Sequence, residues 1–158
     1  MIAKYLFPAY YKKIGWFLFV TGVILGLYYL IFESEPVFFD VRVFSIAKQS
    51  IMGKNAFFLF TENNILDELI GLLLIIGLLI IAFSKEKSED EFISKIRLES
   101  LVWATYINYF ILALSIIFVY DLMFFWILVF NMFTILVFFI IRFNWALYKS
   151  KNQIKDEK

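Results

Sequence analysis

The chain has 158 residues, of which 63% are hydrophobic, and its formal net charge is +1. A soluble domain of this size is usually nearer half apolar, so the composition disfavours an ordinary water-soluble protein. A net charge this close to zero indicates neither a nucleic acid nor an acidic partner, and we expect no nucleic-acid binding.

The sequence contains no cysteine and no histidine. Without cysteine there is no disulfide, no thiolate nucleophile and no thiolate metal site. Without histidine the chain lacks the commonest metal ligand, the usual haem ligand and the usual proton shuttle at neutral pH. These absences exclude four-helix thiol oxidoreductases and di-haem cytochromes, and we expect neither a cofactor nor a metal site.

The apolar residues gather in four uncharged blocks of 19, 16, 21 and 20 residues. About 20 residues at about 1.5 Å each cross the roughly 30 Å hydrocarbon layer, so each block matches a membrane-spanning helix. The second block reaches full length only if its helix starts near Asn64, which is a good N-cap residue. The sequence predicts an all-α integral membrane protein with one domain, 1–158, whose four transmembrane helices form an antiparallel bundle at about 14–32, 65–84, 100–120 and 122–142.

Lysine and arginine are distributed unevenly over the flanks of these blocks. Three lie before the first block, four in the cytoplasmic connection 85–99, and five from Arg142 through the cytoplasmic tail 143–158. The external loop 33–64 holds only three. Because cytoplasmic flanks carry the excess of positive charge, both termini are predicted to be cytoplasmic. The first block is expected to remain as an anchor, since no small-x-small cleavage site follows it.

The external loop 33–64 contains two β-branched and aromatic stretches, Val37–Phe44 and Asn55–Thr61, with turn residues at Gly53–Asn55. This pattern predicts a short β-hairpin between the first two helices. We interpret it as a structured connector; the alternative is a docking edge for an external partner.

The third predicted helix is long. Ser88 to Glu91 has the spacing of a capping box, and neither glycine nor proline interrupts residues 89–120. One helix is therefore expected to begin in the cytoplasmic connection and continue into the bilayer, with Tyr120 and Asp121 as the turn to the fourth. Arg97 and Glu99 are expected at the inner membrane interface in contact with water; the alternative is a contact with lipid phosphate or a partner.

Several residues are candidates for helix packing. Asn108 and Asn131 are expected to hydrogen-bond to neighbouring helices, and a substrate-facing role is the alternative. Gly22 and Gly26 form a GxxxG pattern, which permits close helix approach. The surface that it meets is expected to include two glycines of the second helix, Gly71 and Gly77.

Asp67 and Glu68 form the nearest approach to a carboxylate site. Acids in the first turn of a helix complement its dipole, so we expect them at the outer headgroups. The alternative is weak cation binding, with Asp121 as a third ligand.

Six stretches carry a resemblance to a known family: 66–71, 81–87, 89–93, 95–100, 131–133 and 140–144. Together they resemble a family of small four-helix membrane proteins of Gram-negative bacteria, over residues from about 12 to 148. The resemblance implies the bacterial inner (cytoplasmic) membrane. It implies no activity, cofactor or catalytic residue.

No aspartate, glutamate, lysine or arginine lies inside the four blocks, which favours a non-enzymatic membrane component. It would act as an accessory, regulatory or sensor component through helix packing and its soluble faces. Its partners would be the lipid bilayer and either a membrane protein or further copies of itself. The alternatives are an oligomeric ion or small-solute channel or carrier lined by Asn108, Asn131 and Thr134, and a lipid-modifying enzyme that uses Arg97, Glu99 or the Asp67–Glu68 pair.

Overall fold

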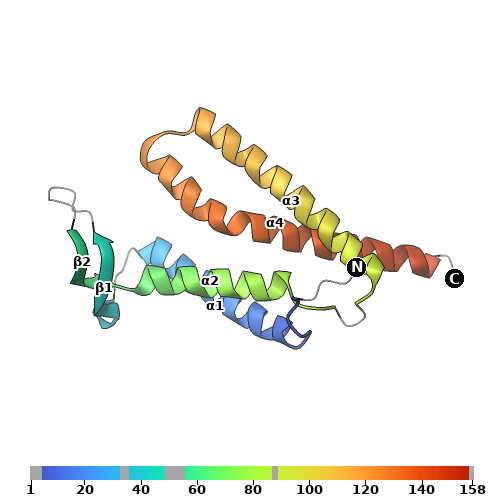
Figure 1. Cartoon of the computed structure of the whole chain (residues 1–158), viewed down its shortest axis with the longest axis horizontal. Helices are drawn as coiled ribbons and strands as arrows, with labels where there is room; N and C mark the ends of the chain where they lie inside the picture. Colours follow the sequence, from blue (N-terminus) through green and yellow to red (C-terminus); the bar gives the residue numbers. More distant parts are fainter. Residues whose placement is uncertain (1–4, 33–35, 49–55, 87–88, 157–158) are drawn as a thin grey trace. The chain divides into compact units, whose positions relative to one another are not determined.

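The computed structural model describes residues 5–32, 36–48, 56–86 and 89–156. This part of the chain is mostly helical, with one small two-stranded sheet (Figure 1). In chain order its elements are α1 (Tyr11–Phe32), the short 3-10 helix η1 (Val37–Phe39), β1 (Asp40–Lys48), β2 (Ala56–Asn64), α2 (Leu66–Ala82), α3 (Glu91–Phe118) and α4 (Asp121–Asp156).

Three helices are long and apolar enough to cross a membrane: α1, α3 and residues 121–150 of α4. Only 11% of the most apolar stretch of α1 is buried, 17% of that of α3 and 11% of that of α4, so most of their apolar side chains face outward. The remaining helix, α2, is more apolar on average than these three but has only 17 residues, roughly 25 Å at about 1.5 Å each.

The chain divides into two compact units, Met1–Phe19 with Leu74–Lys158, and Val20–Leu73. In the first unit α3 and α4 form an antiparallel helical hairpin (Figure 1). Val119 and Tyr120 alone join them, so the turn is as tight as predicted but lies one residue earlier than the expected Tyr120 and Asp121. The chain reverses at Asp121, whose φ of 57° is in the left-handed region that aspartate tolerates better than most residues.

The apolar core of this unit lies where the end of α2 packs on the first half of α3 and the second half of α4. α3 supplies two isoleucines and an alanine to this core, and α4 supplies two phenylalanines, an isoleucine and a leucine. The most deeply buried members are Leu78, Ile81, Ala82, Ala104, Phe139 and Phe143.

The segment before α1 pairs with the connection that follows α2. The backbone N–H of Phe7 donates to the carbonyl of Phe83 (2.9 Å), and the N–H of Lys85 donates to the carbonyl of Phe7 (2.9 Å). This short parallel bridge, centred on Phe7 and Ser84, ties the start of α1 to the end of α2.

In the second unit, β1 and β2 pair antiparallel from Asp40 opposite Asn64 to Lys48 opposite Ala56. The predicted hairpin is therefore confirmed, but β1 begins three residues later than expected because Val37–Phe39 forms η1. The predicted turn at 53–55 lies outside the described residues.

Asn64 is the last residue of β2, and its side chain caps the start of α2. Its side-chain oxygen accepts from the N–H of Leu66 (3.2 Å), and its amide donates to Asp40 (2.7 Å) and to the carbonyl of Pro36 (3.0 Å). The predicted capping role is thus observed, although α2 begins at Leu66, one residue later than expected.

Two further boundaries differ from the expectation. The N-cap of α3 is Asp90, whose carboxylate accepts from the N–H of Ile93 (2.8 Å), so the helix begins too late for Ser88 to act as the cap. Ser88 itself lies outside the described residues. Residues 143–156 of the expected tail continue α4 without a break.

Candidate functional site

Among the described residues, buried charge is concentrated at the junction of α2 and α3, around Arg97. This side chain leaves the second turn of α3 and points into the protein, where the residue is only 6% exposed. Its position differs from the expected hydrated one, because a side chain that extends to water would not be buried to this degree.

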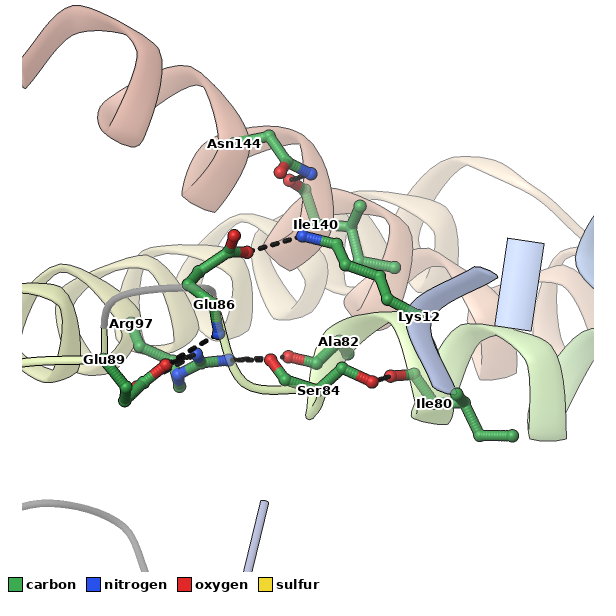
Figure 2. Close-up of polar contacts among 9 residues, drawn as sticks. All are labelled: Lys12, Ile80, Ala82, Ser84, Glu86, Glu89, Arg97, Ile140 and Asn144. Atoms are coloured by element: carbon green, nitrogen blue, oxygen red, sulfur yellow. Dashed lines mark hydrogen bonds and ion pairs between the residues drawn. The ribbon is translucent and has the colours of Figure 1, made fainter. Parts of the chain in front are cut away.

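Glu89 is the charged partner of Arg97. One guanidinium nitrogen donates to both carboxylate oxygens, at 3.1 and 3.2 Å (Figure 2). The two side chains are 8% and 9% exposed, so the ion pair is shielded from water. A pair of this kind is strongly coupled, since the loss of either member leaves the other charge buried.

The second guanidinium nitrogen caps α2. It donates to the carbonyl of Ala82 (3.0 Å), the last residue of the helix, and more weakly to that of Ser84 (3.4 Å), as Figure 2 shows. The last carbonyls of a helix have no partner within it and carry the negative end of its dipole, so a cation is favourable there. Arg97 thus fixes the end of one helix while belonging to the next.

The flat guanidinium of Arg97 also lies over the ring of Phe143, with 4.6 Å between its central carbon and the ring centroid. This contact brings α4 into the junction, and a desolvated cation over an aromatic face is attractive. Among the described atoms, the Nε of Arg97 has no hydrogen-bond partner.

A second ion pair closes the junction from the side of α1. Lys12 pairs with the carboxylate of Glu86, and the backbone N–H of Glu86 donates to the carboxylate of Glu89 (2.9 Å; Figure 2). We call Lys12, Glu86, Glu89 and Arg97 the junction cluster. It joins four segments: the start of α1, the connection after α2, α3 and, through Phe143, α4.

The other carboxylates predicted at an interface are not part of this cluster. Glu99 is exposed on α3. Asp67 and Glu68 are exposed in the first turn of α2, and the carboxylate of Glu68 accepts from the side chain of Asn63 (2.9 Å). The described residues contain no group of three or more acidic side chains that would hold a metal ion, so the suggested cation site is not found in this part of the chain.

Asn108 and Asn131 are brought together. Each amide nitrogen donates to the other amide's oxygen, at 3.4 and 3.3 Å, and this reciprocal pair joins α3 to α4. Three hydroxyls of these helices donate to their own backbone: Thr105 to Leu101, Ser115 to Ile111 and Thr134 to Phe130.

The predicted packing glycines differ in how closely the neighbouring helix approaches them. A Cβ on Gly77 would lie 2.7 Å from the backbone nitrogen of Phe19, so α1 and α2 are in backbone contact at this point. The counterpart on α1 is Gly15, which the sequence reasoning missed because it is not part of the GxxxG pattern. Gly26 only approaches Ile70, at 3.4 Å.

The two other predicted glycines contribute less. Gly22 is buried in α1. A Cβ on Gly71 would meet nothing within 4 Å, so no close approach of helices requires a glycine there.

A scan against protein-family models found no matching model, and searches of curated proteins and of solved structures found no match either. The resemblance to small four-helix inner-membrane proteins therefore stays a prediction.

Proposed function

We propose that this chain is an integral protein of the bacterial inner membrane that crosses the bilayer four times with both termini in the cytoplasm. The outward-facing apolar side chains of α1, α3 and α4 support insertion, because in water they would form a very large exposed patch. The twelve cationic residues on one side against three on the other support the orientation.

The backbone pairing of Phe7 with Phe83 and Lys85 supports the fourth span. It requires the start of α1 and the end of α2 to be on the same side of the membrane, so α2 must cross back if α1 crosses. Its 17 residues are short for the bilayer, and local thinning accommodates such a mismatch at a modest cost in free energy.

Within that frame, the chain acts without catalysis, as an accessory, regulatory or sensor component whose function depends on protein contacts. The observation that carries this proposal is the engagement of its polar groups. Asn108 and Asn131 bond to each other, and Arg97 bonds to Glu89 and to the end of α2. These groups hold helices together, and their bonding leaves them poorly placed to line a pore or attack a lipid.

Crosslinking in native membranes, followed by purification in a mild detergent, tests this function. We expect a stoichiometric membrane-protein partner or a homo-oligomer to be recovered with the full chain. Recovery of a clean monomer that alone modifies phospholipid would contradict the proposal and favour the enzymatic alternative. A monomer that conducts ions in liposomes would favour the channel.

The orientation has its own test. A reporter enzyme that is active only outside the cytoplasm should be inactive when fused after residue 158 and active when inserted in the 49–55 segment. The opposite pattern would refute the orientation without affecting the helical architecture.

A further inference from the structure

Two arginines lie at matching depths in the α3–α4 hairpin. Arg97 precedes the end of α3 at Phe118 by 21 residues, and Arg142 follows the start of α4 at Asp121 by 21 residues. At about 1.5 Å per residue each is roughly 30 Å from the turn, which is the thickness of the hydrocarbon layer. If the turn is at the outer headgroups, both guanidinium groups are at the inner boundary.

The surroundings of the two arginines differ. Arg97 is paired with Glu89 and with backbone carbonyls, as described above. Arg142 lies over two indole rings, with 5.0 Å from its central carbon to the centroid of Trp145 and 5.7 Å to that of Trp103. Its Nε is buried, and no hydrogen-bond partner for that atom is found among the described residues.

An open hollow of about 450 Å³ adjoins this guanidinium. We call it the Arg142 hollow; it is lined by Trp103, Ile141, Arg142 and Trp145. Both tryptophans remain about half exposed beside it, at 42% and 55%. One turn further along α4, the ammonium of Lys149 lies 5.7 Å from the centroid of the Trp145 ring and adds a second positive charge.

We propose that the Arg142 hollow binds the phosphate of an anionic phospholipid in the inner leaflet. Arg142 donates to the phosphate oxygens, Lys149 contributes a further positive charge, and the two indoles pack against the glycerol and upper acyl carbons. This proposal rests on the proposed insertion and orientation.

Three physical properties favour this ligand. A guanidinium with no ion pair at the edge of the hydrocarbon is unfavourable, and among the described residues no ion pair of Arg142 is found. The planar fork of a guanidinium matches two phosphate oxygens. Indole rings concentrate at the headgroup level of membranes. An arginine and a lysine together attract anionic headgroups over zwitterionic ones, since the latter bring their own positive charge.

The test uses the full chain in vesicles that contain equal parts of an anionic and a zwitterionic phospholipid, with brominated acyl chains on one or the other. Bromine quenches tryptophan fluorescence at short range, and the chain has four tryptophans. All variants therefore carry Trp16→Phe and Trp126→Phe, so that the ratio of the two quenching curves gives the lipid preference near Trp103 and Trp145. We expect the brominated anionic lipid to quench more strongly.

Arg142→Gln should lower that preference about fivefold, and Arg142→Lys should retain most of it. Lys149→Gln, an exposed change that leaves the packing intact, should lower it about twofold. Lys13→Gln is the matched control: it removes a cation on the same predicted side, beside Trp16 in a separate hollow, and should leave the preference unchanged.

Equal quenching by both lipids, or an equal effect of Lys13→Gln and Lys149→Gln, would overturn the site while leaving insertion intact. If millimolar inorganic phosphate abolished the preference for the anionic lipid, the hollow would be a site for the free phosphate ion. That result would overturn the phospholipid as its ligand. Absence of quenching by either lipid would instead refute insertion itself.

Discussion

The junction cluster permits a quantitative test through Glu89→Ala. Arg97 would keep its hydrogen bonds to the carbonyls of Ala82 and Ser84 and its contact with Phe143, but would lose its only carboxylate partner among the described residues. Truncation of one member of a buried ion pair costs about 3–5 kcal/mol, because the remaining charge stays uncompensated. The carbonyl bonds lessen this penalty, so we expect about 3 kcal/mol.

The reciprocal change has a smaller expected effect. Arg97→Met leaves Glu89 with the N–H of Glu86, and it removes the cap of α2, a loss of about 2 kcal/mol. In the double variant the cap of α2 is still absent but no charge is stranded, so the double variant should be at least as stable as Arg97→Met. The double-mutant cycle then gives a coupling energy of at least about 3 kcal/mol.

Reversible unfolding in mixed micelles, followed by circular dichroism at the helix band, measures all three variants. Glu99→Ala is the control, since Glu99 is an exposed carboxylate on the same helix and its removal should change stability by less than about 0.5 kcal/mol. Additive single effects, or a Glu89→Ala variant as stable as the control, would refute the assignment of Glu89 and Arg97 as a coupled buried pair.

Two further outcomes follow from the helix contacts, both measurable in the same unfolding assay. Gly77→Ala should lower the free energy of unfolding by about 1–3 kcal/mol, because the new Cβ would collide with the backbone of Phe19. Gly71→Ala is the matched control and should leave it unchanged or raise it by up to about 1 kcal/mol. Equal effects of the two changes would contradict the backbone contact. Asn108→Leu should cost about 1 kcal/mol by stranding the amide of Asn131, and adding Asn131→Leu should recover most of that loss; a further loss in the double variant would argue against the reciprocal pair.

Much of the helical architecture could be predicted from charge spacing and hydropathy alone. The charged residues that bound the first two blocks, and Asp121 between the last two, lie within three residues of helix ends, because ionic side chains do not extend far into an apolar stretch. The other two boundaries were not found in this way: α3 begins eight residues before Glu99, and α4 ends fourteen residues after Arg142. The hairpin was also predictable, since β-branched and aromatic stretches flank turn residues. The continuation of α4 to Asp156 had a signal as well: no glycine or proline follows Asp121.

The junction cluster could not be predicted in the same way. Glu89 precedes Arg97 by eight residues, which is not a spacing at which helical side chains meet, and the capping interaction with α2 depends on how two helices pack. The contact of Gly15 with Gly77 had no signal either, because a single small residue acquires meaning only when the facing helix is known.

The pairing of Phe7 with residues 83–85 has a consequence for biogenesis in the proposed topology. Its two backbone hydrogen bonds cannot form until the ribosome has synthesised the chain through Lys85 and α2 has returned to the cytosol. Until then the segment before α1 has no partner for these hydrogen bonds. In this topology the bridge therefore forms only after α1 and α2 have both inserted correctly. If α2 failed to cross back, the N–H and C=O of Phe7 would stay unpaired, and the exposed segment would be a target for membrane proteases.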